Sequence, residues 1–144
     1  MEASSAWKAF TICLVLFLAK GFATSIYQAR LRIRTNAFVS PEDARWMRAK
    51  SINSESPRIQ RIGAVWRNDL ENIPYFLILA LAYVFLGCWP DGAAFYFGLF
   101  VLFRFAHTAA YLQGLQPLRF ICYSGAVIVS CILAAHILYC TFAN

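Results

Sequence analysis

Apolar runs of about twenty residues follow one another through most of this 144-residue chain. A helix needs about 20 apolar residues to cross the roughly 30 Å hydrocarbon core of a bilayer. The runs therefore predict transmembrane helices over about residues 7–28, 68–87, 93–112 and 118–142, with turns at 88–92 and 113–117. Because 60% of the residues are apolar, against roughly 45–50% in a soluble domain, we expect a single all-α integral membrane domain over residues 1–144, built as a four-helix transmembrane bundle.

The segment from residue 30 to residue 67 has a different composition. It holds nine of the thirteen basic residues and three acidic ones, and so carries the whole net charge of +6. The positive-inside rule places such a segment on the cytoplasmic side, as a basic loop. Both termini and the 88–92 turn then lie on the far side. The apolar run over residues 7–26 has its arginines after it, which favours a retained helix over a cleaved signal peptide.

Within this loop, Ser40, Pro41, Glu42 and Asp43 are typical of a helix start, with a cap, a proline and two acids in the first turn. Basic residues beside a span are ordinary topology determinants and partners of membrane lipids. No nucleic-acid-binding motif accompanies them, so we expect no nucleic-acid partner. The five cysteines lack metal-ligand spacing and are odd in number, so we expect buried thiols, no metal site and no disulfide framework.

Charged and amide side chains gather at one end of the predicted spans. The stretch Arg-Asn-Asp-Leu-Glu-Asn, residues 67–72, opens the second helix, where charge at membrane depth is costly and needs a partner. On the predicted topology the other helices deliver polar groups to the same cytoplasmic level. These are Arg104, His107 and Tyr111 in one stripe of the third helix, Arg119 and Tyr123 on one face of the fourth, and Arg32 near the end of the first.

Two interpretations of this cluster stay open. Asp69 and Glu71 could simply neutralise Arg67 and Arg104, and so tie the helices together. Arginines at this level outnumber the acids, however, and tyrosine and histidine donors accompany them. The surplus positive charge favours a site for an anionic polar molecule. Lys20, inside the first span, is expected to extend its ammonium toward the membrane interface.

These motifs resemble those of the membrane-associated proteins in eicosanoid and glutathione metabolism, the MAPEG family, and within it the branch of microsomal glutathione transferase 1 and microsomal prostaglandin E synthase 1. The resemblance covers nearly the whole chain. It is carried by Asn-Ala-Phe-Val-Ser-Pro-Glu-Asp from residue 36, Arg-Asn-Asp-Leu-Glu-Asn from residue 67, Arg-Phe-Ala-His-Thr-Ala-Ala-Tyr from residue 104, and Pro-Leu-Arg ahead of Tyr123.

The resemblance implies a homotrimer with three glutathione sites at the protomer interfaces, open to the cytoplasm and reached by a lipophilic electrophile through the bilayer. Arg119 would stabilise the glutathione thiolate. Asp43 matches an aspartate proposed as a helper in the prostaglandin synthase. The residues expected to contact glutathione are Arg32 from the adjacent protomer, Arg67, Asn68, Glu71, His107, Tyr111, Arg119 and Tyr123, and the sequence pattern adds Arg104.

Three positions depart from the family pattern. Gln60 and Ala64 stand where a glutamate and an arginine are usual, and Phe120 follows Arg119 where the prostaglandin synthase has a serine. We expect a membrane-bound glutathione transferase that joins the glutathione thiolate to apolar electrophiles, with peroxidase activity towards lipid hydroperoxides as a second reaction. The alternatives are a glutathione-dependent prostaglandin E synthase, which is an endoperoxide isomerase, and a non-catalytic membrane scaffold or adaptor. The membrane would be the endoplasmic reticulum of a eukaryote or the inner membrane of a bacterium.

Overall fold

The computed structural model describes residues 4–142, and helices make up most of them. Three of the helices in this range, α1, α4 and α5, are long and apolar enough to cross a membrane. The remaining long helix, α3, has a polar N-terminal half. In chain order the elements are α1 (Ser5–Thr35), β1 (Ala37–Phe38), α2 (Pro41–Trp46), β2 (Lys50–Ser51), α3 (Pro57–Phe85), α4 (Pro90–Gln113) and α5 (Gln116–Phe142).

The prediction of a basic loop over residues 30–67 is wrong at both of its ends. α1 continues to Thr35 and stops where Asn36 adopts the left-handed conformation at φ 46°. α3 begins at Pro57, well before the expected residue 68. Hydropathy locates the limits of the hydrocarbon, but a helix continues into polar sequence until a residue breaks its backbone pattern. Only residues 36–56 therefore form the connection.

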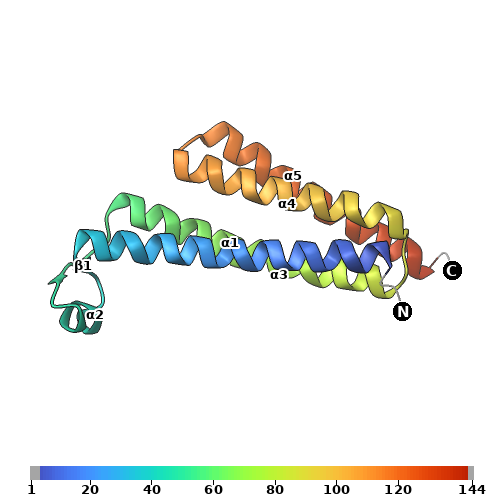
Figure 1. Cartoon of the computed structure of the whole chain (residues 1–144). Helices are drawn as coiled ribbons and strands as arrows, with labels where there is room; N and C mark the ends of the chain where they lie inside the picture. Colours follow the sequence, from blue (N-terminus) through green and yellow to red (C-terminus); the bar gives the residue numbers. More distant parts are fainter. Residues whose placement is uncertain (1–3, 143–144) are drawn as a thin grey trace.

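That connection contains the short helix expected at Ser40. α2 starts at Pro41, with Glu42 and Asp43 in its first turn. The Ser40 hydroxyl donates a hydrogen bond of 2.7 Å to the Glu42 carboxylate, which holds the pKa of Glu42 below its usual value. On either side of α2, β1 and β2 pair in parallel, with Ala37 opposite Lys50. The pairing closes the connection into a compact unit beyond the ends of α1 and α3 (Figure 1).

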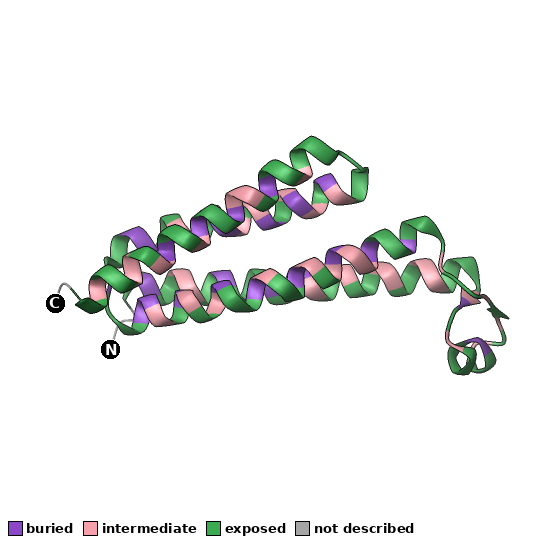
Figure 2. Cartoon of the chain, turned by 180° about the vertical axis from the view of Figure 1, so that it is seen from behind, coloured by how far each residue is buried: buried purple, intermediate pink, exposed green. Residues whose placement is uncertain are grey.

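The long helices form two antiparallel pairs, α1 with α3 and α4 with α5, and α4 also packs on both α1 and α3. The start of α1, the α3–α4 turn and the end of α5 lie together at what we call the terminal end (Figure 1). The α4–α5 turn lies at the opposite, open end, where the two pairs diverge and α1 and α3 run on toward α2. Buried residues follow the inner faces of the helices, whereas the α4–α5 turn is exposed (Figure 2).

Aromatic rings fill the core toward the terminal end. Phe76 of α3 stacks on Phe100 of α4, with ring centroids 3.6 Å apart and planes at 3°. Phe17 of α1 meets the edge of Phe100 at 5.7 Å. α5 closes on α4 through Gly125, where an added Cβ would lie only 2.6 Å from the ring of Phe103. This packing fixes the helices at one end and leaves the polar residues at the other.

Candidate functional site

A buried carboxylate links three helices where the two pairs begin to diverge. Asp69 of α3 accepts a hydrogen bond of 2.5 Å from Nη2 of Arg104 on α4, and a second from Nζ of Lys20 on α1. Arg104 Nη2 also donates to the Asn68 side chain at 2.8 Å. The exposed fractions of Lys20, Asp69 and Arg104 are 5%, 6% and 0%, so two cations and one carboxylate share a site that is shielded from bulk solvent.

This network corrects the expectation for Lys20. Its ammonium does not extend toward the interface, because Asp69 lies within reach at the same depth. Inside the hydrocarbon, a nearby carboxylate stabilises a lysine ammonium more than water at the distant interface does. The sequence left two interpretations of the polar cluster open, which are acids that neutralise the arginines and a site for an anionic molecule. For Asp69 and Arg104 the structure supports the first, because the two side chains form an ion pair. Arg67 and Glu71 are both exposed, and neither forms an ion pair among the described residues.

A polar pocket at the open end brings together five of the predicted binding residues. It lies between α3, α4 and α5 and has a volume of about 220 Å³. The Arg119 guanidinium carbon lies 4.5 Å from the centroid of the Tyr111 ring. The His107 ring lies 5.7 Å from Tyr111 and 6.3 Å from Tyr123. The lining residues are Asn68, His107, Tyr111, Gln116, Arg119, Phe120 and Tyr123.

The electrostatics of this pocket favour an anion. Among residues 4–142 the ion pairs are Lys20–Asp69, Arg32–Glu55 and Arg104–Asp69, so no described carboxylate pairs with Arg119. Beside the pocket, Nε and Nη1 of Arg104 and Nδ1 of His107 are buried without a hydrogen-bond partner in the described structure. Buried polar groups of this kind are normally satisfied by ordered water or a ligand. The pocket can therefore hold a negatively charged, hydrogen-bonding molecule.

The other predicted residues lie outside this pocket. Arg67 and Glu71 are exposed on α3. Nε of Arg32 donates to the Glu55 carboxylate at 2.5 Å. Asp43 is exposed on α2, beyond the ends of α1 and α3 and away from the α4–α5 pair (Figure 1). One chain alone does not bring these four residues to Arg119, so their roles stay predictions.

The sequence pattern did not single out two residues at the pocket, which are Gln116, on the pocket wall, and Arg61, beside the pocket. Arg61 and Gln116 line an adjoining cavity of about 220 Å³ together with Tyr111 and Arg119. Arg61 precedes Asn68 by seven residues, a spacing that puts both on one face of a helix. The spacing is visible in the sequence, but the prediction of a loop over residues 30–67 separates Arg61 from the helix that carries Asn68.

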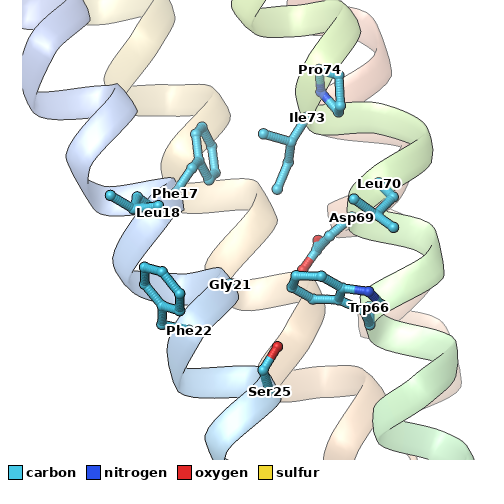
Figure 3. A pocket seen from close by; sticks show the side chains of 10 residues that line it. All are labelled: Phe17, Leu18, Gly21, Phe22, Ser25, Trp66, Asp69, Leu70, Ile73 and Pro74. Carbon is cyan, nitrogen blue, oxygen red and sulfur yellow. The ribbon is translucent and has the colours of Figure 1, made fainter.

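A larger cavity of about 470 Å³ lies between α1 and α3 and is almost entirely apolar. Figure 3 shows Phe17 and Phe22 of α1 facing Trp66 and Ile73 of α3, with the Asp69 carboxylate pointing into the space between the helices. Because Asp69 is already bound to Lys20 and Arg104, this cavity offers no free charge. In the described part of the chain, no three His, Cys, Asp or Glu side chains lie close enough to hold a metal ion.

Comparison with known proteins relates the chain to one family of membrane proteins. A sequence model of the MAPEG family matches residues 10–139. Prostaglandin E synthase of Homo sapiens is 36% identical over 137 residues, which cover 94% of this chain and 90% of that protein. Prostaglandin E synthase of Equus caballus is 34% identical over 140 residues, covering 96% and 92%. Microsomal glutathione S-transferase 1 of Homo sapiens is 36% identical over 116 residues, covering 77% and 75%.

Proposed function

The chain belongs to the MAPEG family, and we propose from this premise that it is a membrane enzyme that binds glutathione in the polar pocket and makes its thiolate react with apolar electrophiles. The observation that carries the proposal is the position of Arg119. Its guanidinium lies on the pocket wall beside Tyr111, and no described carboxylate neutralises it. A relative named microsomal glutathione S-transferase 1 supports the choice of ligand.

The pocket suits the chemistry of glutathione. This tripeptide carries two carboxylates, one ammonium and a thiol whose pKa is about 8.5 in the free form. A guanidinium next to the sulfur favours the thiolate by Coulomb attraction, and so raises the fraction of reactive nucleophile at neutral pH. Asn68, His107 and the two tyrosines offer hydrogen bonds to the peptide groups. In the transferase reaction the thiolate forms a bond to the electrophilic carbon, and the leaving group departs with the bonding electrons.

We further propose that four-helix protomers assemble as a homotrimer and share each site. Arg67 and Glu71 support this, because they lie on an exposed face of α3 that continues with Tyr75 and Ile78, which are 72% and 65% exposed. If a neighbouring protomer covers that face, Arg67 and Glu71 lie next to the neighbouring chain. Arg32 would then reach the site of the adjacent protomer, the site would open to the cytoplasm, and Glu71 would pair with the ammonium of glutathione.

The assembly makes Glu71 a useful probe. We expect Glu71→Gln to weaken glutathione binding by about 1–3 kcal/mol, the usual effect of losing a hydrogen bond to a charged group. Calorimetry on the purified protein measures the affinity, and native mass spectrometry measures the subunit number. Trimers whose affinity is unaltered by Glu71→Gln would show that Glu71 has only a structural role. A monomeric wild-type protein would contradict the shared site.

A second reaction has specific support. Two relatives that match more than 90% of this chain are named prostaglandin E synthase, so glutathione-dependent isomerisation of an endoperoxide is the alternative activity. Phe120 lines the pocket next to Arg119 and puts a ring where that synthase has a hydroxyl. Turnover of an aromatic halide and of an endoperoxide by the same preparation distinguishes the two activities. A scaffold would process neither substrate and would bind no glutathione.

Arg119→Ala tests the proposal directly. We expect the ultraviolet absorbance of bound glutathione thiolate to disappear and turnover to fall at least about a hundredfold, as for other donors that stabilise a developing anion. Arg45→Ala, on the exposed surface of α2, is the matched control and should keep both signals. A full thiolate signal in Arg119→Ala would remove the basis of the proposed mechanism.

A further inference from the structure

A second groove runs along α1 on a different face of α4 from the polar pocket. Near the open end it widens into a basic cavity of about 490 Å³ lined by Tyr27, Pro57, Arg58, Arg61, Leu112 and Gln113. Toward the middle of the helices it continues as an apolar slot of about 290 Å³. Tyr27 and Leu112 line both parts, so the cavity and the slot are consecutive sections of one groove.

If α1 enters the hydrocarbon at its first residue, its length places the groove across the boundary between lipid headgroups and hydrocarbon. α1 begins at Ser5, so Tyr27 lies about 33 Å along the helix at 1.5 Å per residue, close to the roughly 30 Å thickness of the hydrocarbon core. Tyrosines are enriched at this interface. The basic cavity therefore lies at the headgroup level. The slot extends from Tyr27 back to Lys20, about 10 Å into the hydrocarbon.

The basic cavity carries two uncompensated charges. Nη2 of Arg58 donates a hydrogen bond of 2.6 Å to the Tyr27 hydroxyl, and Nη1 of Arg61 lies 3.5 Å from the Leu112 carbonyl oxygen. Neither arginine pairs with a carboxylate among the described residues. Guanidinium groups bind phosphate oxygens through paired N–H donors, and keep spare donors for this while they hold a neutral partner.

The slot has the properties of a site for one hydrocarbon chain. Ala23 and Thr24 of α1 have small side chains, and they line the slot together with Phe105 of α4 and Ile62 of α3. Ile62 has 0% of its surface exposed. Lys20 lies at the inner end, but Asp69 already binds its ammonium. A chain entering the slot would thus meet apolar surface and no free charge.

We propose that this groove binds an anionic phospholipid, with its phosphate between Arg58 and Arg61 and one acyl chain in the slot. Two arginines at the headgroup level and an apolar slot directly below them match the two ends of such a molecule. Arg61 also lines the cavity that adjoins the polar pocket, so the lipid site borders the proposed glutathione site. Arg58 and Ala23 line neither the polar pocket nor that cavity, and changes at these two positions therefore test the lipid site alone. A lipid bound in this groove would hold α4 against α1 and α3 where the helix pairs diverge.

The test uses the full-length protein purified in detergent and native mass spectrometry. Phosphatidylglycerol and phosphatidylcholine with identical acyl chains are titrated separately. We expect one phosphatidylglycerol per chain to bind more tightly than phosphatidylcholine, and Arg58→Gln to weaken it about fivefold, the contribution of one basic residue near an anionic lipid. Arg45→Gln, which removes an exposed charge on α2, should leave the affinity unchanged.

A second pair of variants tests the slot. Ala23→Phe fills it and should abolish the preference, whereas Ala29→Phe, at an exposed position on another face of α1, should not. Glutathione affinity measured in parallel confirms that each variant is folded. Equal binding of the two lipids, or equal affinities of Arg58→Gln and Arg45→Gln, would overturn the proposal. So would displacement of the lipid by equimolar inorganic phosphate, which identifies a soluble anion, or a change of subunit number in Ala23→Phe, which identifies a protein contact.

Discussion

The terminal end and the open end of the molecule differ in what fills the space between their helices. At the terminal end the space is filled with rings and methyl groups, and Tyr83, Ala80 and Leu133 have 0% of their surface exposed. At the open end, the space between α3, α4 and α5 instead contains two polar cavities of about 220 Å³ each. The contrast indicates that packing holds one end together so that the other can remain open to ligands.

The boundary between the two ends is the Lys20–Asp69–Arg104 network. It is a contact between charges, and it joins the three helices α1, α3 and α4. Without hydrophobic driving force inside a bilayer, helix association depends on close packing and on polar contacts of this kind. The network therefore does at the boundary what the aromatic core does at the terminal end, and the predictions below separate the two contributions.

The largest effect is expected from Asp69→Leu, which leaves two buried cations unpaired. Removing one partner of a buried ion pair costs about 3–5 kcal/mol of stability, so we expect a strongly lowered midpoint of thermal unfolding in detergent. The control replaces all three members, as Lys20→Met, Asp69→Leu and Arg104→Met together. Because no charge is then left unpaired, most of the stability should return. A triple variant as unstable as Asp69→Leu would mean that shape, and not charge, matters at this site.

Phe76→Ala tests the terminal end in the same way. It removes one ring of the stacked pair with Phe100 and leaves a cavity, for which a loss of about 3 kcal/mol is typical. Phe85→Ala on the same helix is the control. Phe85 is 73% exposed and meets the edge of the Trp7 ring, so its loss should lower the unfolding midpoint much less than Phe76→Ala. Glutathione affinity of the folded Phe76→Ala protein should stay at the wild-type value. A parallel loss of affinity would show that the two ends are not independent.

The same contrast explains which features could be predicted from the sequence. The apolar runs identified four helices, and the spacing of His107, Tyr111, Arg119 and Tyr123 was enough to group residues that do line one pocket. The limits of α1 and α3 were missed, because hydropathy measures the depth of a bilayer and a helix can extend beyond it. The partner of Lys20 was missed as well, because sequence spacing within one helix carries no information about which other helix lies opposite.

A smaller effect is expected at Tyr111, whose ring lies under the Arg119 guanidinium. Cation–π contacts are worth about 0.5–2 kcal/mol, so Tyr111→Leu should lower turnover between about twofold and thirtyfold without changing the unfolding midpoint. Tyr111→Phe keeps the ring and loses only the hydroxyl. If Tyr111→Phe is as slow as Tyr111→Leu, the hydroxyl is the group that matters and the ring does not position Arg119.

The smallest effect is expected from Phe120→Ser, which places a hydroxyl beside Arg119 in the polar pocket. One added hydrogen bond to the glutathione sulfur is worth about 0.5–1.5 kcal/mol, so thiolate absorbance and endoperoxide turnover should rise between about twofold and tenfold. Ile121→Ser is the control, because Ile121 is similarly exposed but does not line the pocket. Because Phe120 lies far from the aromatic core, neither change should move the unfolding midpoint. An unchanged thiolate signal in Phe120→Ser would leave Arg119 as the group that ionises the thiol by itself.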